Sequence, residues 1–126
     1  MVAKKKRILV VDDDPQISDL ITEFCQDSGY DAKAVNNSEA ALAVAQAWEP
    51  DLITLDLEMP GKDGLKILSE VRHCEQTKNI PVVIISVVAK EIPSSIETVQ
   101  GLFTKPIKFN ALFEKINVLL KPASPQ

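Results

Sequence analysis

Five short runs of aliphatic and β-branched residues are the feature that most limits the folds open to this chain. Between them lie longer segments in which apolar residues recur at helical spacing, as Ile17, Leu20, Ile21 and Phe24 do. Runs that are apolar at almost every position are typical of strands buried on both faces of a sheet, as in parallel sheets covered by helices. The predicted strands are 7–11, 30–35, 52–56, 81–86 and 101–104.

This alternation of strands and helices predicts an α/β fold. We expect a single flavodoxin-like, doubly wound (βα)5 domain with right-handed crossovers and a parallel five-stranded sheet in the order 2-1-3-4-5. A chain of 126 residues fits one such domain. We expect a basic N-terminal tail at 1–6, the folded domain at 7–120, and a C-terminal tail or the start of a linker at 121–126.

Capping and turn residues set the expected helix ends. Asp14 followed by Pro15 predicts the start of the first helix, and Gly29 predicts its end. The second helix is predicted from Asn37 to Trp48, and the third begins after a cap at Asp63. The fourth helix is expected to be short or irregular, because Pro93 interrupts the segment.

Composition excludes several classes of function. The net charge of −4 argues against direct nucleic-acid binding by this domain. No apolar run approaches 18 residues, so we expect no membrane association. Two cysteines, Cys25 and Cys74, are too few for a disulfide framework or a cysteine zinc site, so we expect reduced thiols in a cytoplasmic protein.

Polar residues stand where the predicted strands end. Asp12 and Asp13 follow the first strand, Asp56 ends the third, Ser86 ends the fourth, and Lys105 follows the fifth. Each has an ordinary structural explanation when taken alone, since aspartate and serine are common after strands. The carboxyl ends of parallel strands meet at one edge of the sheet, where α/β folds bind their ligands, so the set together favours a functional site.

These residue types indicate phosphoryl chemistry. Carboxylates crowded at one point repel each other, and Mg²⁺ relieves that repulsion while accepting phosphate oxygens as further ligands. No histidine or cysteine stands at these strand ends, so zinc is not expected. Asp56 is a carboxylate nucleophile for phosphorus, Lys105 is a cation for a phosphoryl oxygen, and the Ser86 hydroxyl is a hydrogen-bond donor for another.

The motifs ILVVDDDP, DLITLDLEMPGKDG, PVVIIS and TKP occur in this order, and with them the chain resembles the receiver domain of two-component response regulators, the CheY-like family. The resemblance extends from about Arg7 to Leu120 and implies signal transduction by a phosphoprotein. Asp56 would accept a phosphoryl group from a phosphohistidine, giving an aspartyl phosphate. Asp12, Asp13, Asp56 and the backbone carbonyl of Glu58 would hold Mg²⁺ or Mn²⁺. Ser86 and Lys105 would bind the phosphoryl group, and the Lys105–Pro106 peptide bond would be cis.

The sequence departs from the family pattern in the region that switches. The family usually has an aromatic residue three positions before the lysine, where this chain has Leu102, and Phe103 is expected on the opposite face of its strand. Ser86 and Leu102 are therefore the expected switch positions. Val87 replaces a smaller residue and is expected to narrow access to the site. The stretch from Ser86 to Lys105 is also about one helical turn shorter than expected.

Glu58 and Val88 flank the position where receivers set the lifetime of the phosphoryl group. The effect of an acidic Glu58 stays open, since its carboxylate either orients or repels the attacking water.

The resemblance implies a histidine kinase or histidine phosphotransfer protein as the donor. Ile17, Leu20 and Pro106 are candidate docking residues, and the alternative for the first two is a role in the core. The output would be a protein target or a covalently linked output domain.

The function expected from these residues is that of a phosphoacceptor that is not itself an enzyme. Two other functions stay open. One is a degenerate receiver that binds proteins without phosphorylation. The other is an aspartate-nucleophile phosphatase, in which Asp56 is the nucleophile and Glu58, two residues later, is the second acid.

Overall fold

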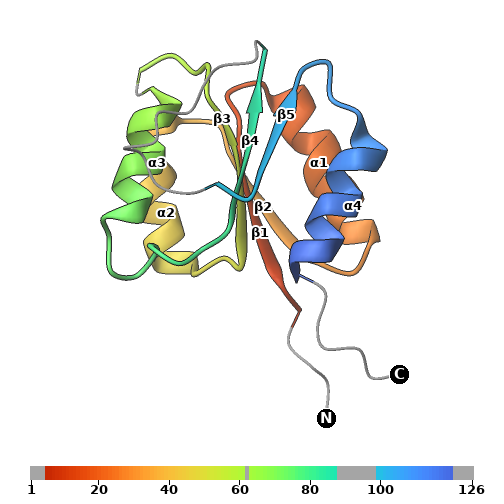
Figure 1. Cartoon of the computed structure of the whole chain (residues 1–126), viewed down its shortest axis with the longest axis horizontal. Helices are drawn as coiled ribbons and strands as arrows, with labels where there is room; N and C mark the ends of the chain where they lie inside the picture. Colours follow the sequence, from red (N-terminus) through yellow and green to blue (C-terminus); the bar gives the residue numbers. More distant parts are fainter. Residues whose placement is uncertain (1–4, 62, 88–98, 121–126) are drawn as a thin grey trace.

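A five-stranded parallel sheet forms the centre of the molecule, as the strand pattern predicts. The computed structural model describes residues 5–61, 63–87 and 99–120. The strand order is β2-β1-β3-β4-β5 (Figure 1), which confirms the predicted topology. The strands are β1 (Arg7–Val11), β2 (Asp31–Val35), β3 (Leu52–Asp56), β4 (Val82–Ser86) and β5 (Gly101–Thr104).

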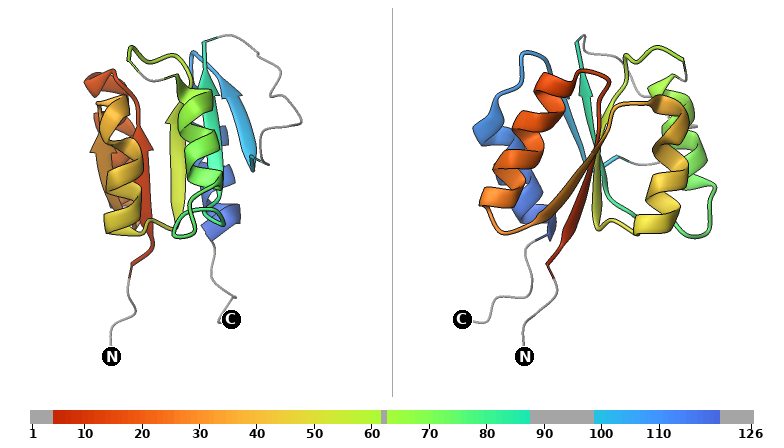
Figure 2. Two further views of the ribbon diagram at one scale, coloured as in Figure 1. Left: turned by 90° about the vertical axis from the view of Figure 1, so that its left-hand side faces the viewer. Right: turned by 180° about the vertical axis from the view of Figure 1, so that it is seen from behind.

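Helices cover both faces of the sheet. Figures 1 and 2 show one pair of helices on one face and a second pair on the other. The first pair is α1 (Pro15–Asp27) and α4 (Phe109–Leu120), and the second is α2 (Ala41–Trp48) and α3 (Gly64–Arg72). Two hydrophobic clusters follow from this arrangement, because alternate residues of β1 face opposite sides: Ile8 and Val10 pack toward α1 and α4, whereas Leu9 and Val11 pack toward α2 and α3.

Local capping agrees with most of the predicted helix ends. Asp14 caps α1 by accepting a hydrogen bond from the Gln16 backbone N–H, and Asp63 caps α3 in the same way. The second helix differs from the prediction. A 3₁₀ turn, η1 (Ser38–Ala40), follows the Asn37 cap, and the α-helix begins only at Ala41.

Some predictions fall outside the described residues. They are the fourth helix with Pro93, Val88, and the tails at 1–4 and 121–126. Within the described residues, no helix combines the length and the apolarity needed to cross a bilayer. Cys25 of α1 belongs to the core, since its side chain is fully buried.

The register between neighbouring strands determines where the polar residues at the strand ends lie. Val11 of β1 pairs with Leu55 of β3, so the residues that follow them, Asp12 and Asp56, lie at the same level. Asp56 in turn pairs with Ile85 of β4, one residue before Ser86. The polar residues predicted at the strand ends are therefore neighbours in space.

Candidate functional site

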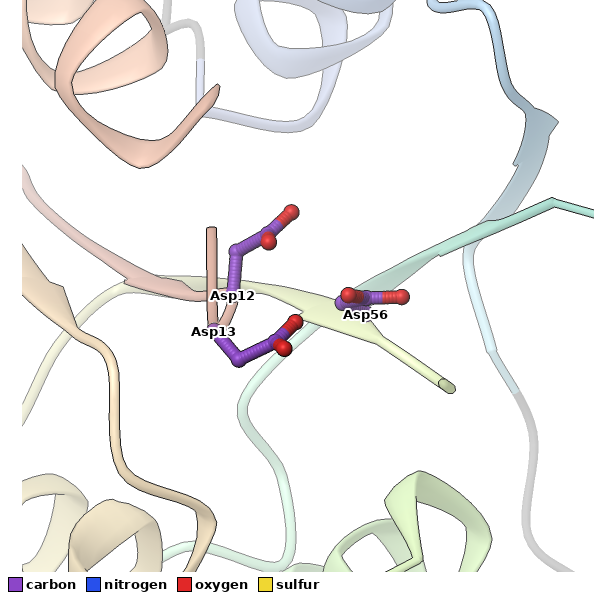
Figure 3. Close-up of side chains that lie close together, drawn as sticks. All are labelled: Asp12, Asp13 and Asp56. Carbon is purple, nitrogen blue, oxygen red and sulfur yellow. The ribbon is translucent and has the colours of Figure 1, made fainter. Parts of the chain in front are cut away.

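Three carboxylates meet at the carboxyl edge of the sheet. Oxygen atoms of Asp12, Asp13 and Asp56 lie within 4.8 Å of one another. Figure 3 shows Asp12 and Asp13 beyond the end of β1, with the Asp13 carboxylate directed toward Asp56 on β3. Asp12 and Asp56 are each only 1% exposed, whereas Asp13 is partly buried. The structure therefore brings together the three acids that the sequence analysis selected.

Lys105 supplies the cation of this cluster. Its Nζ lies 3.3 Å from Asp56 Oδ2 and 3.5 Å from Asp12 Oδ2. The Lys105 backbone N–H donates to the Ser86 carbonyl oxygen at 2.7 Å, which continues the pairing of β4 with β5 beyond the last strand residue. The Lys105–Pro106 peptide bond is cis, as expected. One ammonium group thus contacts both buried carboxylates.

Burial and charge together set the proton affinity of these groups. Burial raises the pKa of Asp56 to about 6, and repulsion from Asp12 also raises it. The hydrogen bond from the Glu58 backbone N–H and the attraction of Lys105 lower this pKa, but by less. Burial likewise raises the pKa of Asp12. For Lys105, burial lowers the pKa, but attraction by Asp12 and Asp56 outweighs it, so that the pKa is raised.

The donor set fits a hard divalent cation. Asp12 Oδ2 is buried and receives no hydrogen bond from any residue that the structure describes. The Lys105 ammonium lies 3.5 Å from this atom but is shared with Asp56, so a further cation would stabilise the two buried carboxylates. The ligands on offer are carboxylate oxygens, which Mg²⁺ prefers, and neither of the two cysteines joins the cluster. The residues present are therefore suited to Mg²⁺.

Ser86 and Glu58 interact in a way that the sequence analysis missed. The Ser86 hydroxyl donates to Glu58 Oε2 at 2.5 Å, and the Val87 backbone N–H donates to Glu58 Oε1 at 2.8 Å. The Glu58 backbone N–H donates to Asp56 Oδ1 at 3.1 Å. Glu58 thus contacts β4 through its side chain and Asp56 through its main chain, whereas the predictions for Glu58 concerned its carbonyl group, the attacking water and a role as second acid.

Two further residues position the acids and were also missed. The Asn36 side-chain amide donates to the Asp12 carbonyl oxygen and to the Ser18 hydroxyl. Gly64 begins α3 directly against the site, and a Cβ atom there would lie 2.5 Å from Leu57 Cα. The available signals were weak: a polar residue directly after β2, and a glycine where a helix begins.

The predicted switch and docking residues differ in exposure. Leu102 is 44% exposed, and Phe103 packs into the core on the other face of β5, as the alternation predicts. Leu20 is 50% exposed, Pro106 is exposed, and Ile17 is partly buried against the core. Val87 is exposed at the end of β4. The roles of these residues stay predictions.

Comparison with known proteins identifies relatives over almost the whole chain. A sequence model of the family described as "response regulator receiver domain" matches residues 8–117. The "DNA-binding dual master transcriptional regulator RpaA" of a Synechocystis species is 32% identical over 118 residues, which are 91% of this chain and 49% of that protein. The "phosphate regulon transcriptional regulatory protein PhoB" of Pseudomonas aeruginosa is 29% identical and covers 95% of this chain. The chain spans about half the length of these curated relatives.

Solved structures agree with this result. The chemotaxis protein CheY4 of Vibrio cholerae superposes with a TM-score of 0.85 at 25% identity, covering 93% of this chain and all of that one. A sensor protein from a Polaromonas species has a TM-score of 0.84 at 25% identity and covers 92% of this chain and 96% of that one. The similarity therefore includes the fold and the order of its elements.

Proposed function

The chain belongs to the response regulator receiver domain family, and on this basis we propose that it is a phosphoacceptor in which Asp56 takes a phosphoryl group from a phosphohistidine donor in a Mg²⁺-dependent reaction. One observation carries the proposal: buried Asp56 lies in a cluster of three carboxylates and contacts Lys105. A signalling role fits the family better than turnover of a free substrate.

The transfer is a displacement at phosphorus. A carboxylate oxygen of Asp56 forms the new O–P bond while the N–P bond to the donor imidazole breaks. The imidazole keeps the electron pair of the broken bond and takes up a proton from solvent. Lys105 is placed to offset negative charge on the phosphoryl oxygens, because its ammonium already contacts Asp56 Oδ2.

Mg²⁺, or Mn²⁺ in its place, would be held by the carboxylates of Asp12, Asp13 and Asp56 and by the backbone carbonyl of Glu58. When bound, the ion would supply positive charge for the phosphoryl oxygens. The buried Asp12 Oδ2, which accepts no hydrogen bond from the described residues, and the carboxylate donor set support this assignment. Asn36 would keep the Asp12 backbone in place through its 2.7 Å hydrogen bond.

The partners follow from the family. The donor would be a histidine kinase or a histidine phosphotransfer protein docking near Ile17, Leu20 and Pro106. The output would pass through Ser86 and Leu102 to a protein target or a linked output domain. Several relatives are named as DNA-binding regulators. The net charge of −4 supports signalling by this domain without contact of its own to nucleic acid.

The decisive experiment is intact-mass measurement after incubation with acetyl phosphate, with Mg²⁺ and with a chelator. We expect a gain of one phosphoryl group only with Mg²⁺, and none in Asp56→Asn. Asp19→Asn is the matched control, since Asp19 is an exposed aspartate on α1 and should leave uptake intact. Uptake that persists in Asp56→Asn would show that another residue is the acceptor.

A second candidate function is protein binding without phosphorylation. The observation that favours it is the contact of Glu58 with Ser86 and Val87, which occupies both donors before any phosphoryl group arrives. In this case the protein would take up no phosphoryl group from acetyl phosphate or from a phosphorylated histidine phosphotransfer protein. The phosphatase alternative predicts turnover of a small phosphate ester, and membership of the receiver family weighs against it.

A further inference from the structure

Among the residues that the structure describes, two donors at the end of β4 bind the Glu58 carboxylate. One of its oxygens accepts from the Ser86 hydroxyl at 2.5 Å and the other from the Val87 backbone N–H at 2.8 Å. Ser86 is fully buried, so its hydroxyl has little access to water as an alternative partner. Charge-assisted hydrogen bonds of this length are strong, and two of them fix both the carboxylate and the backbone that follows Ser86.

These two donors form an anion-binding pair beside Asp56. Asp56 pairs with Ile85, and the Leu57 backbone N–H donates to the Ile85 carbonyl oxygen at 3.1 Å. The pair is therefore one residue beyond the β4 position that borders the acceptor aspartate. A phosphoryl group on Asp56 brings terminal oxygens that need donors of this kind.

We propose that the Glu58 carboxylate is an internal competitor for the phosphoryl group, holding Ser86 and Val87 until phosphorylation displaces it. This inference rests on the proposed function of Asp56. Glu58 is a positioning residue in this scheme, because it acts through Ser86 and Val87 and not on phosphorus. The two effects considered for Glu58 from sequence both concerned water, and the observed contacts indicate a third effect.

Charge explains why the two anions exclude each other. Asp12, Asp13 and Asp56 already crowd three carboxylates at this edge, and the Lys105 ammonium contacts two of them, Asp12 and Asp56. A phosphoryl group adds further negative charge at the same edge, so it repels the Glu58 carboxylate while competing for its donors. The release of Glu58 frees Ser86 and Val87 to donate to the phosphoryl group.

The experiment compares initial rates of phosphorylation by acetyl phosphate at saturating Mg²⁺, measured by intact mass. Glu58→Ala removes the carboxylate and keeps the backbone carbonyl, and Glu58→Gln keeps the shape without the charge. We expect both variants to be phosphorylated faster, by about fivefold, the effect of losing one charge-assisted competitor. Glu75→Ala is the control, because it removes an exposed glutamate that pairs with Lys78 and is not one of the site residues.

A second readout needs neither Mg²⁺ nor activity. In metal-free wild-type protein, the Val87 amide proton should have the downfield NMR shift of a hydrogen bond to a carboxylate, and the shift should be lost in Glu58→Ala but kept in Glu75→Ala. A purely structural effect of Glu58 would change stability without changing the phosphorylation rate in this direction.

The outcomes separate the two proposals. Wild-type uptake at a rate that neither Glu58 variant exceeds would overturn the competitor role and leave the function of Asp56 standing. Uptake by both Glu58 variants with none by the wild type would support the competitor role. Absence of uptake in the wild type and in both variants would overturn this inference and the proposed function together.

Discussion

The side-chain amide of Asn36 donates a hydrogen bond of 2.7 Å to the carbonyl oxygen of Asp12, joining the ends of two neighbouring strands. The same amide donates to the buried Ser18 hydroxyl at 2.9 Å, which links both strand ends to α1. Asp12 carries one of the two most buried carboxylates of the site. The position of the acidic cluster therefore depends on a neutral residue from outside it.

Asn36→Ala should weaken both the fold and the metal site. The loss of two partly buried hydrogen bonds should lower the free energy of unfolding by about 1–3 kcal/mol and reduce Mg²⁺ affinity. Chemical denaturation and calorimetric Mg²⁺ titration measure the two effects. The control is Asn37→Ala, which removes the cap of η1 and should lower stability by about 1 kcal/mol without changing Mg²⁺ affinity. Equal Mg²⁺ affinity in both variants would contradict the positioning role.

Gly64→Ala should disturb the backbone beneath Asp56. The added Cβ would lie 2.5 Å from Leu57 Cα and 2.8 Å from the Asp56 carbonyl oxygen, so either α3 or β3 must shift. We expect a loss of stability of about 2 kcal/mol or more, together with slower phosphorylation. Gly29→Ala is the control, because no atom lies within 4 Å of its new Cβ. Its positive φ of 98° alone should lower the free energy of unfolding by about 1 kcal/mol. A normal phosphorylation rate in Gly64→Ala would show that the acceptor tolerates the shift.

The metal-free protein should lose stability as the pH rises toward neutrality. Because burial raises the pKa of Asp56 from 3.8 to about 6, the folded state binds this proton more tightly than the unfolded chain. The stabilising contribution is complete below the unfolded pKa and is lost as pH rises through about 6. Between about pH 4 and pH 7 the loss should be on the order of 1–3 kcal/mol.

Urea denaturation at a series of pH values with a chelator present measures this slope. The raised pKa of Asp12 adds a contribution of the same sign. Asp56→Asn should flatten the dependence, and saturating Mg²⁺ should reverse it, because the ion binds the ionised carboxylates. A metal-free stability that increases over the same range would contradict the sign derived from burial.

Asp13→Ala should have opposite effects on the metal-free and metal-bound protein. Removing one of three crowded acids relieves repulsion, so the melting temperature without Mg²⁺ should rise by about 2–5 °C. Mg²⁺ affinity should fall about tenfold or more, because one carboxylate ligand is lost. Thermal scans with and without Mg²⁺ give both values. Asp19→Ala is the control, and an unchanged affinity in Asp13→Ala would refute the ligand role.

The sequence predicted the fold well because its strands are apolar on both faces and its helix starts carry strong caps. Asp14 and Asp63 cap their helices as expected, and Leu102 and Phe103 point to opposite faces because alternation in a strand is fixed by geometry. The acidic cluster was predictable for a similar reason, since parallel strand order alone brings Asp12 and Asp56 together.

The contacts that hold the site in place were not predictable in this way. Glu58 and Ser86 are 28 residues apart in sequence, and their hydrogen bond depends on the path of the loop after β3 and on the side-chain conformation of Glu58. The bond between Asn36 and Asp12 likewise joins two loops. Such contacts depend on tertiary geometry and leave no periodic signal in the sequence.

The ends of the described domain give it the properties of a modular unit. Arg7 begins β1 at the amino edge of the sheet, and α4 returns to that same edge to end at Leu120 (Figure 1). A strand of five residues separates this edge from the carboxylates by about 16 Å. A domain fused before Arg7 or after Leu120 would therefore be attached at the amino edge of the sheet. In either fusion the point of attachment would lie away from the acidic carboxyl edge, where the donor must approach.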